Sequence, residues 1–430
     1  MSRLPRPVWL LGWVSLATDA ATELIYPLLP FFLTRVLHAD AVSLGVIEGA
    51  AEAASSLLKI WAGGVADRSP RKRPLVLLGY SISSLARPFI ALTTTWTQVF
   101  TVRVLDRVGK GVRSAPRDAM LAGWATPTTR GKVFGFHRGM DHAGAIIGPT
   151  LASVFLFFYP DQYRLLFGLT IIPGAIAVAL IFLVPEPDQV RLTTSAKATA
   201  VKKADTTQAG LKTRATPVTA ETRAPDVVAQ DFSPAVVSAP LPPSFNRFMM
   251  VLALFTLGNS TDAFLLLRLT DAAGTVRFVP LMWAGLHVVK ASVSMAAGSW
   301  SDRIGRRTVI ATGWIVYAMV YAGFALSTAI LPLLGWFLLY GFYFGFAEGT
   351  EKALVADLAP AERRGLAFGI YNAVTGVGAL AASIFFGLVW NAYGTTAAFG
   401  LGAALALLAT MLLFVVLPRE ATPAGSAGLL

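Results

Sequence analysis

The chain has 430 residues, of which 55% are hydrophobic and only 14% are charged, and its formal net charge is +12 at pH 7. This apolar content excludes a soluble globular domain. The chain contains no cysteine and only four scattered histidines, which gives no support to a thiol nucleophile or a structural metal site. We therefore expect an integral membrane protein that is not an enzyme and that needs neither a cofactor nor a metal.

Apolar runs close to the twenty residues that cross a bilayer as a helix recur along the whole chain. Because lipid cannot satisfy unpaired backbone groups, each run is predicted to be a helix. The first run follows MSRLPRP and has no small-residue cleavage site, so we expect an uncleaved helix and not a signal peptide. The twelve predicted spans cover residues 8–34, 42–63, 74–95, 97–115, 133–158, 164–185, 247–268, 278–299, 308–329, 332–350, 366–390 and 396–417.

Basic residues concentrate on alternate connections between these spans. The connections that carry most of them contain Arg3, Arg6, Arg68, residues 71–73, 113–132, 186–246 and 303–307, Arg363 and Arg364. By the positive-inside rule, this distribution predicts cytoplasmic N- and C-termini in the cell (inner) membrane. The positive charge then reflects membrane topology, so the expected surroundings are a lipid bilayer and no nucleic acid.

Residues 186–246 separate the sixth and seventh spans and contain few large apolar residues. Such a segment cannot bury enough surface to offset the entropy of folding, which predicts a disordered cytoplasmic linker. A docking site for a partner is the alternative interpretation. The predicted domains are an N-terminal six-helix bundle (1–185), this linker, a C-terminal six-helix bundle (247–417) and a cytoplasmic tail (418–430).

The two halves repeat one another in sequence. GGVADRSPRKR and GSWSDRIGRR each follow the second span of a half, and their aspartates, Asp67 and Asp302, are 235 residues apart. RGKVFG at Arg130 and RGLAFG at Arg364 likewise precede the fifth span of each half. Matched loops in two six-helix repeats are typical of a transporter.

These residues resemble the major facilitator superfamily over nearly the whole chain outside the linker. The family's loop signature is a glycine, an aspartate four residues later, an arginine and a basic cluster, and only Pro70 departs from it, in place of a turn glycine. The resemblance implies an all-α membrane fold of twelve helices in two pseudosymmetric bundles. It also implies a cytoplasmic gate, in which the aspartates accept hydrogen bonds from a helix start and the arginines pair across the halves. The expected gate residues are Gly63, Asp67, Arg68, Arg71, Gly298, Asp302, Arg303 and Arg306.

Residues 103–109 of the fourth span, RVLDRVG, resemble the family's fourth-helix signature, with Asp106 where glutamine is usual and Arg107 in place of the first glycine. The signature arginine is Arg103, or Arg107 in a shifted register. Either arginine is costly in lipid unless it faces a cavity or a carboxylate, such as Asp106 or the acids of the first two helices. The following GVRSAPRD is predicted to be a cytoplasmic loop.

In the fifth span, GAIIGPTLA contains Gly144, Gly148 and Pro149 and resembles the Gly-x-x-x-Gly-Pro signature of the drug/proton antiporter branch. Small residues allow close helix approach, and proline permits bending. The corresponding stretch from Gly378 lacks the Gly-Pro pair. A helix-packing seam is the alternative explanation of the same glycines.

Charged and titratable residues within the spans fall mainly on the helices that surround the family's cavity. Buried carboxylates can take up and release protons near neutral pH. Glu52, or Asp19 with Glu23, is the predicted proton-coupling site, and the 235-residue offset places Glu52 opposite His287. Structural ion pairs are the alternative for each residue. The proposed proton-coupling and cavity residues are Asp19, Glu23, Glu48, Glu52, Arg103, Arg107, Asp141, His142, Asp262, His287 and Lys290.

The sequence thus predicts a monomeric secondary transporter that alternates access by rocking its two halves. Its expected function is proton-coupled export of a small organic compound, with protons as the coupling ion. A proton-coupled importer or a facilitator of a polar metabolite is the second interpretation, and a non-transporting membrane sensor is the third.

Overall fold

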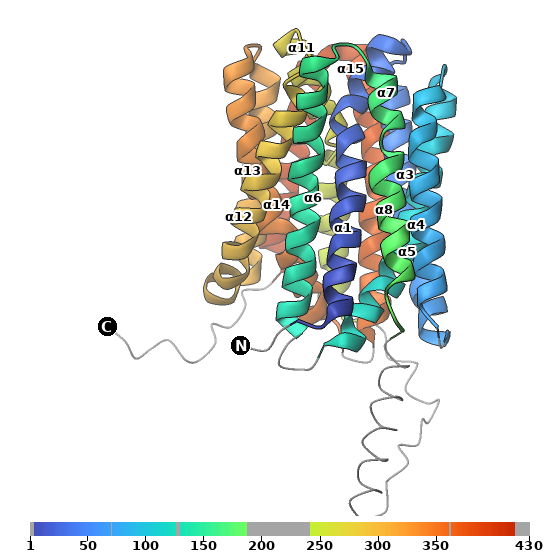
Figure 1. The fold of residues 1–430 in the computed structure, drawn as a ribbon. Coiled ribbons are helices and arrows are strands. Elements are labelled where there is room, and N and C mark those ends of the chain that lie inside the picture. Colours follow the sequence, from blue (N-terminus) through green and yellow to red (C-terminus); the bar gives the residue numbers. More distant parts are fainter. Residues whose placement is uncertain (1–3, 70, 126–129, 187–240, 361–362, 418–430) are drawn as a thin grey trace, which may run out of the picture.

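The computed structural model describes residues 4–69, 71–125, 130–186, 241–360 and 363–417, and no strand occurs among them. The linker and tail predictions, at 186–246 and 418–430, therefore lie almost wholly outside the described residues. The described chain forms one upright bundle of helices, with its N-terminal and C-terminal halves side by side (Figure 1).

The N-terminal half, described over residues 4–186, contains six membrane spans, of which three are interrupted. Its first span runs through a 3-10 turn and a π-helical turn without leaving the membrane, and its sixth is built from two short helices. The elements are α1 (Arg6–Ile25), η1 (Tyr26–Leu28), α2 (Leu29–Phe31), η2 (Phe32–Val36), α3 (Ala41–Arg68), α4 (Arg73–Ala86), η3 (Arg87–Leu92), α5 (Trp96–Trp124), α6 (Arg130–Phe158), α7 (Tyr163–Gly168) and α8 (Ile171–Phe182).

The C-terminal half, described over residues 241–417, repeats this plan. Its first span is also broken, at the polar stretch Asn259–Asp262 between two helices. The elements are α10 (Pro243–Gly258), α11 (Ala263–Ala273), α12 (Val279–Ile304), α13 (Arg306–Leu326), α14 (Ile330–Leu358) and α15 (Arg364–Val416).

The twelve predicted spans all correspond to helices of the structure. Within the described residues, nine helical stretches are long and apolar enough to cross a bilayer. The other three arise because α5 is too charged along its length, the described apolar part of α12 is shorter, and α15 contains two spans that meet at Gly394. Gly394 has φ 83°, a left-handed conformation that glycine adopts without strain.

The predicted end of the fourth span is wrong. GVRSAPRD is helical, and α5 continues to Trp124 with Pro116 inside it. Burial explains the difference, because Val112, Arg113 and Pro116 pack inside the bundle and are not exposed on a connection.

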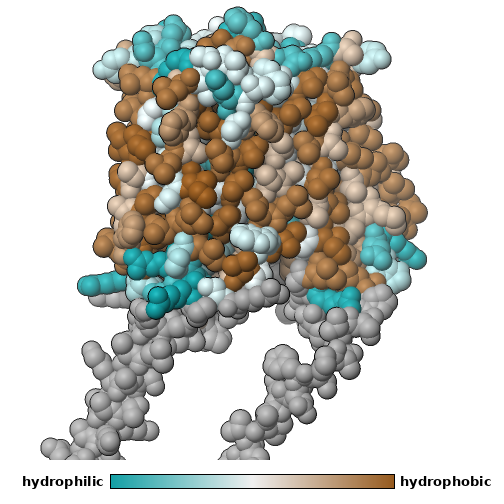
Figure 2. Space-filling model, turned by 90° about the vertical axis from the view of Figure 1, so that its right-hand side faces the viewer, coloured by the Kyte–Doolittle hydropathy of each residue, from teal (hydrophilic) through white to brown (hydrophobic). Residues whose placement is uncertain are grey.

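The outer surface shows how the bundle sits in a bilayer. A broad apolar belt covers the middle of the molecule, and hydrophilic residues gather at both ends (Figure 2). Many large apolar side chains of the spans are exposed, among them Leu85, Phe157 and Val415. Exposure of this kind is expected only where lipid, and not water, is the solvent.

We call the end where α1 begins and α3 ends the lower end, as drawn in Figure 1, and the opposite end the upper end. The two halves meet along α3 with α15 and along α6 with α12. Glycines permit the closest approaches between α3 and α15. A Cβ on Gly45 would lie 2.2 Å from the Ser383 carbonyl oxygen, and one on Gly387 would lie 2.7 Å from that of Ala41.

Three hydrogen bonds between the halves add to this contact at the upper end. Arg35 pairs with Asp271 at 2.7 Å, and Ser153 donates to the Arg277 carbonyl at 2.9 Å. Asn391 donates to Asp40 at 3.1 Å. The upper end is therefore closed by packing and by polar contacts together.

Asp40 is the N-cap of α3, and it accepts hydrogen bonds from the Ser43 amide at 2.8 Å and from the Ser43 hydroxyl. Partial burial acts against ionisation, but these bonds and the one from Asn391 lower the pKa of Asp40. The stabilisation is therefore present above the ordinary aspartate pKa and is lost as the pH falls through the lowered value.

Asp40→Ala should lower the thermal unfolding temperature of the purified protein in detergent, because loss of an N-cap costs about 1 kcal/mol. Asp40→Asn, which keeps a capping oxygen, should stay much closer to the parent protein. Equal losses in the two variants would contradict the capping role.

Candidate transport site

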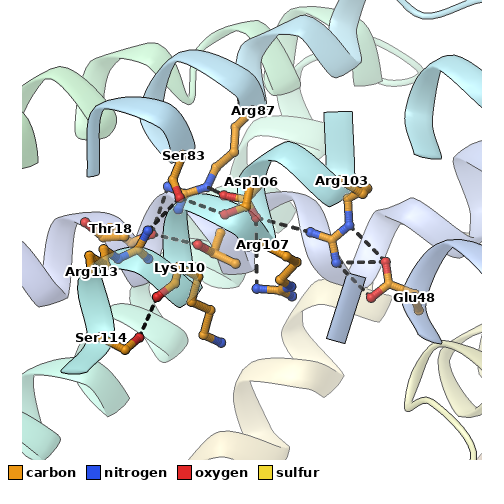
Figure 3. Close-up of polar contacts among 11 residues, drawn as sticks. Thr18, Glu48, Ser83, Arg87, Arg103, Asp106, Arg107, Lys110, Arg113 and Ser114 are labelled. Atoms are coloured by element: carbon orange, nitrogen blue, oxygen red, sulfur yellow. Dashed lines mark hydrogen bonds and ion pairs between the residues drawn. The ribbon is translucent and has the colours of Figure 1, made fainter. Parts of the chain in front are cut away.

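A buried network of charges holds α3, α4 and α5 together (Figure 3). Arg103 binds both carboxylate oxygens of Glu48, at 2.9 Å from Nε to Oε1 and 2.8 Å from Nη2 to Oε2. The side chains of both residues are at most 6% exposed. Among the carboxylates that the sequence offered as partners of Arg103, the structure selects Glu48 of the second span.

Asp106 is the second acid of this network. It accepts a hydrogen bond from Arg87 Nε at 2.8 Å and lies 3.7 Å from Arg103 and 3.9 Å from Arg107. The pairing explains how Arg87 can be buried within a membrane span. Arg113 donates to Ser83 at 2.6 Å, which extends the network towards the lower end. These contacts join α3, α4 and α5, and the Arg107–Asp106 distance is the longest of these ion pairs.

The C-terminal half uses neutral donors where the N-terminal half uses arginines. Glu351 accepts hydrogen bonds from Trp314 Nε1 at 2.9 Å and from the Tyr371 hydroxyl at 3.0 Å. Asp262 accepts one from the Tyr340 hydroxyl at 2.7 Å. Aromatic rings around these acids form the core of the half.

A cavity of about 330 Å³ lies between the halves, against α3 on one side and α10, α14 and α15 on the other. Glu52 and Lys59 line it from α3, and Phe255, Tyr343 and Glu348 are among its residues from the C-terminal half. Pockets of this size hold small organic ligands. Of the predicted site residues, Glu52 is the one that this cavity exposes to a ligand.

The position of the cavity follows from the packing of α3. Close α3–α15 contacts extend down to Ser56, whose Oγ would lie 2.8 Å from a Cβ on Gly376. Two turns further, a Cβ on Gly64 would meet nothing within 4 Å, and Ile60 and Trp61 are exposed. The halves therefore separate towards the lower end, where the cavity lies.

The expected juxtaposition of Glu52 and His287 is wrong. His287 lies beside Glu23, at 4.0 Å between Nε2 and Oε2, and Trp283 of the same helix donates to Glu23 at 2.7 Å. No residue of α12 is among those that line the cavity at Glu52 in the described part of the chain. The offset does hold for Tyr26 and Thr261, which are 235 residues apart and whose hydroxyls lie 3.5 Å from one another.

Asp19 and Asp141 face one another across the α1–α6 contact. Ser15, one turn before Asp19, donates to Asp141, and a Cβ on Gly144 would lie 3.1 Å from the Asp19 Cβ. Among the described residues, Asp19 has no hydrogen bond or ion pair of its own. Asp141 also lies 3.6 Å from His137 and 3.7 Å from Arg138.

The antiporter-like glycines lie in the same contact. A Cβ on Gly144 would come within 2.4 Å of the Leu16 carbonyl oxygen, and one on Gly148 within 2.3 Å of that of Ala20. A side chain at either glycine would therefore prevent the close packing of α6 on α1. Pro149 lies inside α6 and does not end the helix. The close packing is consistent with the helix-packing interpretation of the two glycines.

Lys290 and His142 are the remaining predicted residues. The Lys290 ammonium lies 3.5 Å from the centre of the Phe344 ring, a cation–π contact within the C-terminal half. His142 lies partly buried on α6.

The predicted cytoplasmic gate is described only in part. The described side chains do not include those of five predicted gate positions, namely Asp67, Arg68, Gly298, Asp302 and Arg303. Arg71 is exposed, and Arg306 pairs with Asp357 within its own half. Gly63 faces Ala115 of α5.

A different contact joins the halves towards the lower end. Arg138 of α6 donates to Glu348 of α14 at 3.2 Å, and Glu348 also binds Lys352 at 3.2 Å. Neither Glu348 nor Arg138 is among the site residues predicted from the sequence. The available signal was the i,i+4 spacing of Glu348 and Lys352 in an apolar span.

Two related six-helix halves, an apolar outer belt, buried paired charges and a cavity between the halves define a membrane transporter of the secondary type. The model of the Major Facilitator Superfamily matches residues 11–287 and 248–428. The chain therefore belongs to this family.

Similar proteins agree with this assignment. An uncharacterized MFS-type transporter of Methanocaldococcus jannaschii is 29% identical over 419 residues, which cover 96% of this chain and 95% of the relative. The multidrug resistance protein MdtH of Photorhabdus laumondii is 29% identical over 32% of this chain and 34% of its own length. The solved structure of the nucleoside transporter NupG superimposes with a TM-score of 0.70 at 14% identity, covering 97% of this chain and 100% of the other.

Glu48→Gln should destabilise the protein strongly, because it leaves Arg103 buried with only the more distant Asp106. Breaking a buried pair in this way costs about 3–5 kcal/mol. The measurement is thermal unfolding in detergent, with Asp118→Asn, a neutralised acid on the surface, as the control. Replacing both partners, Glu48→Leu with Arg103→Met, should recover part of the loss, and no recovery would contradict a role confined to this pair.

Proposed function

We propose that this transporter exports a small organic compound in exchange for protons, with its lower end in the cytoplasm of the cell. The observation that carries the proposal is the cavity at Glu52, which lies between the halves and widens where their packing ends. The clustering of arginines and lysines on the lower-end connections supports a cytoplasmic lower end. Close packing above the cavity supports an inward-facing arrangement in which the Arg138–Glu348 contact is still formed.

Asp19 is the better candidate for the coupling proton, and Glu52 is the better candidate for contact with the substrate. Asp19 faces a second carboxylate, Asp141, so a proton on either one relieves their repulsion. Glu52 instead lines the cavity, on the same face of α3 as Lys59. A carboxylate that faces a ligand-sized cavity is suited to binding a charged group.

Arg138 would connect the proton site with the lower gate. It lies between Asp141 of its own half and Glu348 of the other. When the halves part, Arg138 keeps Asp141 and Glu348 keeps Lys352, so neither charge is left without a partner. A gate of this kind opens at small cost because its ion pairs are exchanged and not broken.

Relatives differ in what their names state. MdtH is named as a multidrug resistance protein, whereas a solved structure with a TM-score of 0.68 at 15% identity is that of a D-xylose-proton symporter. A proton-coupled importer of a polar metabolite is therefore the second candidate function, and the polar lining of the cavity favours it.

Asp19→Asn should abolish substrate-driven proton movement in proteoliposomes that contain a pH-sensitive dye, because the variant has no exchangeable proton at this site. Glu52→Gln should instead raise the apparent KM for substrate while residual transport stays coupled. Coupled flux in Asp19→Asn at the parent rate would rule out Asp19 as the carrier. Substrate flux without proton movement in the parent protein would indicate a facilitator, and no flux with any compound would favour a sensor.

Lys59→Cys should react with a membrane-impermeant maleimide from the cytoplasmic side only, because the cavity opens at the lower end. The natural chain has no cysteine, so labelling has no background. Tyr159→Cys, at the exposed upper end, should react from the outside and serves as the matched control. Adding Arg138→Gln should speed labelling at position 59 several-fold, and an unchanged rate would contradict the gate.

A further inference from the structure

The walls of the cavity differ in how much hydrogen-bonding capacity they leave for a ligand. On the C-terminal side, the polar groups largely bind one another. Glu351 is bound by Trp314 and Tyr371, and Asn259 donates to the Tyr343 hydroxyl at 2.9 Å. Glu348, also on this wall, is already shared between two cations. Little is left on this side to bind a charged ligand.

The α3 wall, in contrast, leaves its polar groups available to a ligand. Glu52, Ser56 and Lys59 line the cavity at spacings of four and three residues, so they share one helix face. Within the described part of the chain, none of these three side chains takes part in a hydrogen bond or an ion pair. They present a carboxylate, a hydroxyl and an ammonium in a row, with the two charges about 10 Å apart along the helix axis.

Apolar side chains face this row. Leu252, Phe255 and Phe344 line the cavity from α10 and α14. One face of the Phe344 ring is already covered by Lys290, so a ligand meets these rings as an apolar surface. The available space is therefore bounded by a dipolar wall and an apolar wall.

We propose that the transported compound is a zwitterionic amphiphile, with a cationic amine that binds Glu52, an acidic group that binds Lys59 and an apolar body against α10 and α14. A purely cationic ligand would leave its charge beside Lys59, and a purely anionic one beside Glu52. A neutral ligand would desolvate both charges and pair neither. This inference rests on the proposed function only in taking the cavity to be the transport site.

The test is equilibrium binding to the purified, full-length protein in detergent at pH 7. The probes are two scaffolds, an ω-amino acid that carries a phenyl group and a tripeptide with one aromatic side chain. Each is used as the zwitterion, the methyl ester, the N-acetyl derivative and the doubly blocked compound. We expect the zwitterion to bind about tenfold more tightly than either singly blocked form, because each blocking group removes one charge-assisted contact.

The variants assign each end of the ligand to a residue. Glu52→Gln should abolish the preference for the zwitterion over the N-acetyl form, and Lys59→Gln the preference over the ester. Glu52→Asp, which keeps the charge, should retain the parent order, as should the surface control Asp118→Asn. Equal binding of the doubly blocked compound, an order unchanged by both variants, or no binding of any form to the parent protein would overturn the proposal.

Equilibrium binding at a fixed pH, without a pH gradient, does not depend on whether transport is coupled to protons. A zwitterion that binds as expected but moves no protons in proteoliposomes would therefore overturn the proton-coupled function and leave this inference standing.

Discussion

Arg103 lies inside a bundle whose outer surface faces lipid, where an unpaired guanidinium is costly, and it is neutralised by Glu48 and Asp106. The two acids come from different helices, so the pairing fixes α3 against α5, and Arg87 of η3, which follows α4 directly, is added through Asp106. Much of the rest of the structure depends on this constraint. Because Glu48, Arg103 and Asp106 are paired within the N-terminal half, these charges keep their partners whatever the position of the other half.

The interface between the halves differs between its upper and lower parts. Above Ser56, backbone approaches backbone at glycines of α3 and α15, and side-chain bonds such as Arg35 with Asp271 add to the contact. Towards the lower end, α3 lines the cavity with Glu52, Ser56 and Lys59, and its apolar residues Ile60 and Trp61 are exposed. A rotation about the upper contact changes the width of the lower cavity while the charge network of the half stays intact.

The sequence was sufficient for the helices and the repeat, because apolar length and the two Asp-Arg loops depend on local composition. It was insufficient for contacts between the repeats. In the structure, Tyr26 and Thr261 are 235 residues apart and in contact, and both lie at breaks in the first spans of their halves. The same 235-residue offset fails for Glu52 and His287 because α3 packs on α15 whereas α12 packs on α6. Pseudosymmetric residues on these helices therefore lie on opposite sides of the axis.

The sequence predicts that a buried arginine needs a carboxylate partner, but it does not predict which carboxylate this is. Arg103 required a carboxylate, and only the packing of α3 on α5 selects Glu48 from several acids. The same packing separates the two carboxylates proposed for transport, since Asp19 faces Asp141 on the α1–α6 contact and Glu52 faces the cavity. Arg138 contacts Asp141 on one side and Glu348 on the other. If Asp19 and Asp141 share a proton, Asp141 holds Arg138 less firmly, and the guanidinium is freer to bind Glu348. On the proposed function, proton uptake would thus strengthen the lower gate through a single side chain.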